Sequence, residues 1–278
     1  MRPLRHLEAT LEVTVEVVKC GPDGTIDPAC LARALKEPAR LVAVNHASNV
    51  TGALAPIERV SDIAHAAGAS LLVDAAQTAG AYPIDVAAMG IDYLAFTGHK
   101  SLFGPQGTGG LVMTAEPPRP LIFGGTGSNS EKELLPELYP DRLESGTLNG
   151  VGIAGLAAGL EYIDERSVEA IGRSARARLG RLLEGLSSTN GVRVHGPADP
   201  ERQIGVISIT FEGRSPAEAG LLLDDDFGVL TRVGLHCSPA AHRTIGTFPE
   251  GTVRLSISDM TTDEQVEQAI AAVRELAR

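Results

Sequence analysis

Lys100 stands in a setting that suits a reactive amine. It closely follows the apolar run 93–97, within the segment Thr-Gly-His-Lys, and a loop rich in glycine and small residues comes after it. A lysine that is partly desolvated near another cation has a lowered pKa and can attack a carbonyl to form a Schiff base. Taken alone, the tripeptide Gly-His-Lys is more typical of a solvated surface lysine.

Asp74 ends the apolar run 70–74, 26 positions before Lys100. A carboxylate placed at the end of a buried strand is costly unless a positive group pairs with it. The protonated ring nitrogen of a cofactor would be such a partner. Alternatively, Asp74 caps the N-terminus of a following helix.

Cys237 is the cysteine best placed to act as a nucleophile. Arg232 and His236 are near it in the sequence, and positive neighbours favour a thiolate. Read in isolation, it could instead be a small buried apolar residue. The chain has three cysteines, with no paired spacing typical of a metal site or a disulfide framework. We therefore predict no metal site and a reducing cytoplasmic setting.

Composition narrows the class of partner. The formal net charge is -11 and the basic residues are scattered, which disfavours nucleic-acid binding. No apolar stretch reaches the roughly 18 residues that a membrane span needs, so we expect a protein with no membrane segment.

The first half of the chain alternates strand and helix signals. Strands are expected at 11–19, 41–46, 70–74, 93–100 and 109–113. Helices are expected to start near Asp27 and at Pro56, the second ending at Gly68. This alternation predicts a parallel sheet whose ligand site lies at the carboxyl ends of the strands, where Asn49 and Asp74 would lie.

A stretch rich in glycine and proline runs to about residue 148 and suggests a boundary between domains 1–148 and 149–278. A long helical region is expected from 149, followed by strands at 206–211, 228–232 and 252–257. Thr261 and Glu264 are expected to form the capping box of the last helix.

Six motifs in order resemble the cysteine desulfurase and selenocysteine lyase branch of the class V aminotransferases. They are His46-x-Ser48-Asn49, Asp74-Ala75-Ala76-Gln77, Thr97-Gly98-His99-Lys100, Ser145-Gly146-Thr147, Gly234-Leu235-His236-Cys237 and Arg254. The resemblance covers nearly the whole chain. It implies an α/β fold of the fold-type I class that uses pyridoxal phosphate (PLP), with a mostly parallel sheet, helices on both faces, and a smaller α+β C-terminal domain.

The resemblance also implies roles for individual residues. Lys100 would bind PLP covalently, Asp74 would pair with the ring nitrogen, and Arg254 would bind the substrate carboxylate. Asn49 and Gln77 would lie near the ring hydroxyl, with Asn49 also at the substrate, while Thr97 and His99 would hold the phosphate. Thr147 would reach the phosphate site of a neighbouring subunit, which implies a homodimer.

The implied reaction removes sulfur or selenium from L-cysteine or L-selenocysteine and leaves alanine. Cys237 would take the sulfur as a persulfide, for possible delivery to an acceptor protein. Two alternatives remain: another class V reaction, such as transamination, epimerisation or β-elimination, and a non-catalytic remnant. The family has about a hundred residues before the part matched here, including a phosphate-binding helix start and a stacking histidine. We therefore expect this chain to lack that part.

Overall fold

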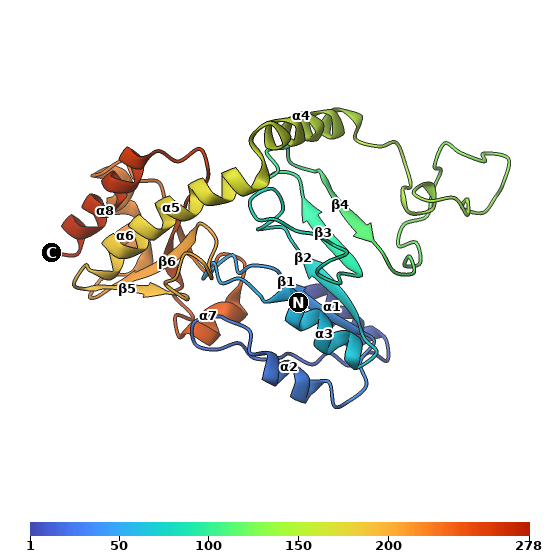
Figure 1. Cartoon of the computed structure of the whole chain (residues 1–278), viewed down its shortest axis with the longest axis horizontal. Coiled ribbons are helices and arrows are strands. Elements are labelled where there is room, and N and C mark those ends of the chain that lie inside the picture. Colours follow the sequence, from blue (N-terminus) through green and yellow to red (C-terminus); the bar gives the residue numbers. More distant parts are fainter.

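A computed structural model describes residues 1–278, and it contains two β-sheets joined by long helices (Figure 1). The strands are β1 Leu41–Asn45, β2 Ser70–Asp74, β3 Tyr93–Thr97, β4 Gly109–Met113, β5 Val192–His195, β6 Val206–Phe211, β7 Arg232–Gly234 and β8 Thr252–Ser256. The helices are α1 Arg2–Thr10, α2 Pro28–Ala34, α3 Ile57–Ala66, α4 Gly150–Arg166, α5 Val168–Ser187, α6 Pro216–Asp225, α7 Pro239–Ile245 and α8 Asp263–Leu276, with a short 3₁₀ helix η1 Asp141–Leu143.

The first sheet has the strand order β1-β2-β3-β4, and two of its three pairings are parallel. Asn45 pairs with Asp74, and Asp74 pairs with Ala95, so the carboxyl ends of β1, β2 and β3 meet at one edge. This arrangement confirms the predicted parallel units. Strand β4 returns antiparallel to β3 because residues 98–108 form a connection too short for a crossover helix.

Helices α2 and α3 cover one face of this sheet. Ile57 and Val60 of α3 pack with Leu71 and Val73 of β2 in one buried cluster, which also takes in Leu31 of α2. The helix predicted to start at Pro56 is therefore confirmed as α3. The packing fixes β2 firmly, and with it the position of Asp74.

The second sheet is antiparallel throughout, in the order β5-β6-β8-β7. Its core lies between the sheet and the helices α5, α6 and α8, where Leu179, Ile207 and Val253 are fully buried. The predicted strand 206–211 is confirmed, and the strand predicted at 252–257 forms as β8.

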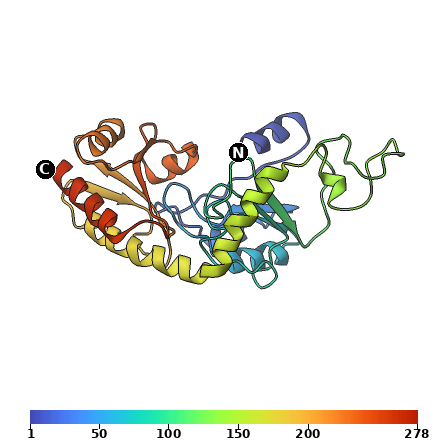
Figure 2. The same ribbon diagram turned by 90° about the horizontal axis from the view of Figure 1, so that it is seen from above.

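The helical region expected from residue 149 is two helices. Figure 2 shows α4 and α5 as one bent arm that leads from the first sheet to the second. The break falls at Ser167, whose φ is 67° and whose side chain accepts a hydrogen bond from the Ala170 N–H. Ser167 therefore ends one helix and caps the next.

Three predicted elements need correction. Segment 11–19 alternates like a strand but forms none, and it pairs with no strand of either sheet. The strand expected at 228–232 forms later in the sequence, as β7 at Arg232–Gly234. The capping box is formed by Thr262 and Gln265, one residue later than expected. No element of the structure is a helix long and apolar enough to cross a membrane.

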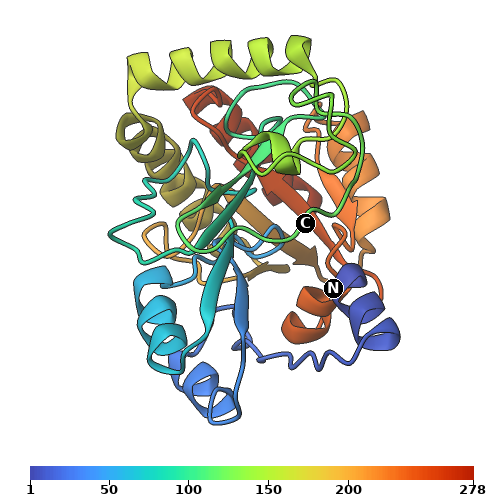
Figure 3. The same cartoon turned by 90° about the vertical axis from the view of Figure 1, so that its right-hand side faces the viewer.

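The connection 114–149 extends away from both sheets (Figure 1), and it comes toward the viewer in Figure 3. Apart from η1 it has no regular secondary structure. It carries large apolar side chains into solvent: Leu121 is 93% exposed, Phe123 75% and Leu134 83%. Such a concentration of exposed apolar side chains is typical of a surface that another molecule covers.

Four histidines are buried in this fold: His46, His195, His236 and His242. Burial lowers the pKa of all four. The pKa falls to about 4 at His46, His195 and His236, and nearby cations reinforce the shift at His195 and His236. Their imidazoles are therefore neutral in the folded protein at neutral pH.

We expect the free energy of unfolding to fall as the pH drops from 7 to 5. Unfolded histidines take up protons near pH 6.5, whereas His46, His195 and His236 in the folded protein do so only near 4, so acid favours the unfolded chain. Each of these three histidines contributes up to about 1.4 kcal/mol per pH unit in that window. Urea denaturation at both pH values measures the effect. His195→Gln should weaken the pH dependence, whereas the exposed-site control His6→Gln should not. Equal unfolding free energies at pH 7 and pH 5 would contradict this expectation.

Candidate active site

The turn after β3 fixes where Lys100 lies. The Gly98 N–H donates to the Thr108 carbonyl at 2.9 Å, and the Gly104 N–H donates to the Gly98 carbonyl at 2.8 Å. A Cβ atom at Gly98 would lie 2.1 Å from Thr108 Oγ1, so any larger residue would displace Thr108. The tight turn holds Lys100 just beyond the carboxyl end of the sheet.

Three charged residues from distant parts of the chain meet at this edge. The pKa of the Lys100 ammonium is lowered, mainly because the group is partly desolvated even though the residue is exposed. The positive charge of Arg254 lowers this pKa further, whereas the negative charge of Asp74 raises it. The influence of both charges on the Lys100 pKa indicates that Asp74 and Arg254 lie near Lys100. Because Arg254 belongs to β8, the site lies between the two sheets.

Asp74 has one carboxylate oxygen engaged. Its Oδ1 accepts from the Ala76 N–H at 2.9 Å, while Oδ2 makes no hydrogen bond. The capping alternative is thus partly right, although the residues after Asp74 form turns rather than a helix. The second oxygen remains available for a cationic partner.

Arg254 offers an unmatched donor. Its Nη1 donates to the Asn49 carbonyl at 3.0 Å, but its Nε is buried and donates to nothing. The pKa of Arg254 is lowered, mainly because the guanidinium is buried. Arg232, which pairs with Arg254 across β7 and β8, lowers it further, whereas Cys237 raises it. A buried N–H without an acceptor, beside a second guanidinium, favours an anionic ligand such as a carboxylate.

Cys237 is exposed, and its neighbours on both sides are tied to Asn49. Asn49 Nδ2 donates to the His236 carbonyl at 2.6 Å, and Ser238 Oγ donates to Asn49 Oδ1 at 2.8 Å. An amide side chain has two N–H groups and two lone pairs, so one of each remains for a ligand. Cys237 therefore lies at the mouth of the same site as Arg254 and Asn49.

The remaining candidate residues are only partly brought together. Thr97 Oγ1 and His99 Nδ1 are 2.7 Å apart beyond the end of β3. Gln77 is half-buried, and its side chain makes no hydrogen bond. Thr147 is exposed in the extended connection and meets none of the others within this chain. Ser208, Ser238 and Thr252, which hold the Cys237 loop, had no signal in the sequence, because their partners come from separate elements.

These residues fit PLP. Lys100 is an amine of lowered pKa near a carboxylate that has a free oxygen, and Thr97 and His99 supply polar groups at the same edge of the sheet. The unmatched Nε of Arg254 suits the carboxylate of an amino acid bound to that cofactor.

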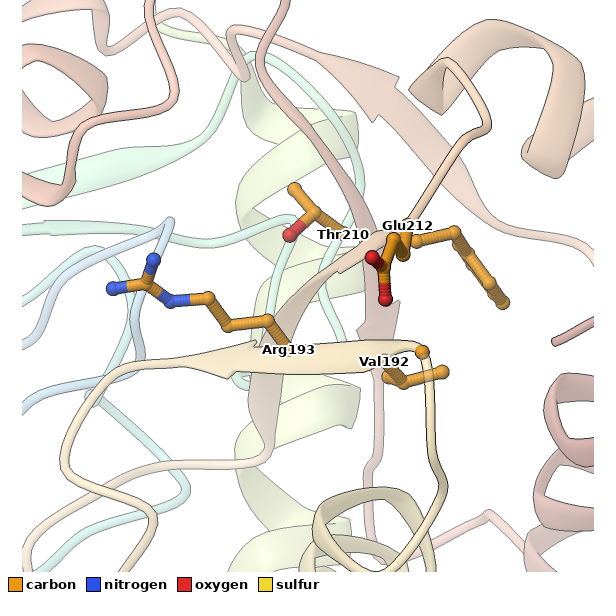
Figure 4. Close-up of a pocket in the computed structure, with 6 residues that line it drawn as sticks. Val192, Arg193, Thr210 and Glu212 are labelled. Carbon is orange, nitrogen blue, oxygen red and sulfur yellow. The ribbon is translucent and has the colours of Figure 1, made fainter.

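A separate hollow of about 260 Å³ lies at β5 and β6 and contains none of these residues. Figure 4 shows Arg193 and Glu212, which line it, pointing in different directions. Its polar groups do not converge, so we regard the edge between the sheets as the functional site.

The chain belongs to the class V aminotransferase family. The family model described as "Aminotransferase class-V" matches residues 1–269. Members of this family depend on PLP, and the fold is that of the fold-type I enzymes, as the resemblance implied.

The relatives are cysteine desulfurases. A probable cysteine desulfurase of Methanothermobacter thermautotrophicus is 34% identical over 271 residues, which cover 95% of this chain and 67% of that protein. A cysteine desulfurase of Escherichia coli O157:H7 is 31% identical, with 99% and 68% covered. The solved structure of a cysteine desulfurase from Thermococcus onnurineus NA1 matches with a TM-score of 0.89 at 32% identity, covering 100% of this chain and 69% of that one. The chain thus spans about two thirds of the length of these relatives, and the comparisons support a PLP-dependent cysteine desulfurase function.

Proposed function

We propose that this chain carries the catalytic site of a PLP-dependent cysteine desulfurase that acts on L-cysteine. The observation that carries the proposal is the meeting of Lys100, Asp74, Arg254 and Cys237 from both sheets at one edge. An amine, a carboxylate, a guanidinium and a thiol are the four groups that this chemistry needs.

Lys100 would hold the cofactor covalently, and the free oxygen of Asp74 would accept a hydrogen bond from the ring nitrogen. Asn49 and Gln77 would contact the ring hydroxyl. Thr97 and His99 would bind the phosphate, together with Thr147 of a second subunit. When bound, PLP supplies an electron sink for the substrate Cα.

Arg254 would bind the substrate carboxylate, and Lys100 would move the proton at Cα. The ionised sulfur of Cys237 would then attack the substrate sulfur. The new S–S bond forms as the substrate Cβ–S bond breaks, its electron pair stays with the carbon, and protonation of that carbon yields alanine. Cys237 is left as a persulfide, so one cysteine gives one alanine and one transferable sulfur atom.

The proposal extends to partners and setting. The exposed apolar side chains of 114–149 suit a homodimer interface, which would also bring Thr147 to the partner's cofactor. A second protein would accept the sulfur, since the exposed position of Cys237 allows it to be reached. We place the domain boundary at 148/149, between the two sheets. Three free cysteines suit a reducing cytoplasm.

The substrate distinction remains part of the proposal. L-Selenocysteine is a second candidate because selenium leaves carbon more readily and depends less on Cys237. Alanine is therefore measured from both amino acids in the presence of PLP and a thiol reductant, together with sulfide from L-cysteine and selenide from L-selenocysteine. Formation of alanine with matching sulfide supports the desulfurase. Formation of pyruvate or of a keto acid would favour another class V reaction, and no turnover of either amino acid would favour the non-catalytic alternative.

We expect Arg254→Lys to raise the KM for L-cysteine by about tenfold or more while PLP binding is retained. A lysine cannot reproduce the two parallel hydrogen bonds of a guanidinium to a carboxylate, and the loss of one charge-assisted bond is worth about 1.5 to 3 kcal/mol. Steady-state kinetics and PLP titration check this. The neighbouring exposed variant Arg232→Lys is the control, and we expect a smaller change there. An unchanged KM in Arg254→Lys would mean that another residue binds the carboxylate.

A further inference from the structure

The loop that carries Cys237 is held in an uncommon backbone conformation. His236 has φ of 48° and Cys237 has φ of 62°, so two consecutive residues other than glycine lie in the left-handed region. Each such residue is strained, and the conformation persists only where surrounding contacts over-determine it. The contacts that do so are therefore part of how the thiol is presented.

A chain of side-chain hydrogen bonds starts at the His236 ring. Its Nε2 lies 3.0 Å from Thr252 Oγ1, Thr252 Oγ1 lies 3.0 Å from Ser208 Oγ, and Ser208 Oγ lies 2.7 Å from the Val50 carbonyl. All four residues are buried, with Ser208, Thr252 and Val50 at 0% exposure. The chain thus runs from the Cys237 loop, through the second sheet, to the loop that follows β1.

The Val50 carbonyl, at the end of this series of hydrogen bonds, fixes which group donates in each of them. The Val50 carbonyl can only accept, so Ser208 donates its single hydroxyl hydrogen to it. Ser208 must then accept from Thr252, and Thr252 must accept from His236. The His236 ring therefore carries a proton on Nε2. A second proton on Nδ1 is resisted because that nitrogen is buried without a partner, and burial lowers the His236 pKa to about 4. His236 is thus neutral at neutral pH, so the expectation that it acts as a positive neighbour of Cys237 is wrong.

A second set of hydrogen bonds holds the Cys237 loop through Asn49, the residue before Val50. The Asn49 amide bonds the residues on both sides of Cys237, and its carbonyl accepts from Arg254. The same short segment, Asn49 and Val50, therefore fixes the positions of both the Cys237 loop and Arg254. Displacement of the loop would carry the sulfur away from that guanidinium.

We propose that Ser208 and Thr252 are positioning residues for Cys237. Through the His236 ring they lock the left-handed loop and keep the exposed thiol beside Arg254, the residue proposed to hold the substrate. The inference rests on the proposed function only in giving Cys237 the part of nucleophile.

Thr252→Val and Thr252→Ser test this role as a matched pair. Valine has nearly the shape of threonine but breaks the chain at its centre, whereas serine keeps the hydroxyl. The first readout is the rate at which iodoacetamide alkylates Cys237 in protein without added PLP, measured by peptide mass spectrometry. Cys20 and Cys30 in the same sample serve as internal references.

We expect Thr252→Val to slow alkylation of Cys237 relative to Cys20 by about fivefold, the change in population that the loss of one ordinary hydrogen bond produces. Thr252→Ser should restore the rate. An unchanged Cys237 to Cys20 ratio in Thr252→Val, or an equal loss in both variants, would overturn the proposal. If Thr252→Val does not fold, Ser208→Ala, which removes the next hydroxyl, takes its place with the same expected and contrary results.

The second readout is turnover with PLP. Thr252→Val should lower kcat for sulfur release by at least about fivefold, with the affinity for L-cysteine and for PLP unchanged. A change in KM alone would overturn the positioning role. Absence of sulfur release in the unmodified protein would count against the proposed desulfurase, while the alkylation rates would still decide the role of Thr252.

Discussion

Lys100→Ala should abolish covalent attachment of PLP and lower the formation of alanine from L-cysteine by at least about a thousandfold, because the residue both holds the cofactor and moves the Cα proton. The lowered pKa of the Lys100 ammonium, which desolvation causes, makes it the amine best suited to this bond.

The assignment can be checked sharply because the chain has only four lysines: Lys19, Lys36, Lys100 and Lys132. Borohydride makes the bond between lysine and PLP permanent, and peptide mapping then identifies the labelled residue. Lys36→Ala, at an exposed site beyond α2, is the matched control and should behave as the unmodified chain. A label on any other lysine, or undiminished turnover in Lys100→Ala, would show that the role of Lys100 is wrong.

Cys237→Ser should reduce sulfide release from L-cysteine by at least about a hundredfold, because a hydroxyl is a far weaker nucleophile than a thiolate. PLP binding should be unchanged, since Cys237 lies with Arg254 on the substrate side of the site. Cys20→Ser is the control, because Cys20 is also exposed but contacts none of the candidate site residues.

The comparison of two substrates refines this result. Loss of cysteine turnover with survival of selenocysteine turnover would support a persulfide route and an easier departure of selenium. Sulfide release at the normal rate in Cys237→Ser would mean that another group accepts the sulfur.

The sequence was sufficient to predict the parts of the site that depend on local signals. Asp74 and Lys100 each follow a short apolar run, and glycine marks the turn before Lys100, so their place at strand ends could be inferred. The apolar stripe of α3 and the core strand β6 were equally visible, because burial on one face or on both leaves a periodic or continuous apolar pattern.

Features that depend on distant partners could not be predicted in this way. Segment 11–19 has the alternation of a strand, but a strand forms only where another strand is available to pair with it. The antiparallel return of β4 follows from the shortness of 98–108 rather than from its composition. Thr252 and Ser208 were missed because their hydrogen bonds join residues that are 44 positions apart in the sequence.

The family resemblance supplied what local signals could not. It joined Arg254 and Cys237 to Lys100 across about half of the chain, and the structure places Arg254 near both. Thr147 shows the limit of a single chain, because its implied partner is on another subunit and no contact within this chain brings it to the site.

The mass of the Cys237 peptide after a single exposure to L-cysteine tests the central claim most directly. The protein is loaded with PLP, mixed with L-cysteine without reductant, quenched with an alkylating agent and digested. We expect the Cys237 peptide to gain one sulfur atom, in an amount equal to the alanine formed, and the Cys20 and Cys30 peptides to gain none. Alanine formed without added sulfur on Cys237, or sulfur found equally on all three cysteines, would contradict this account.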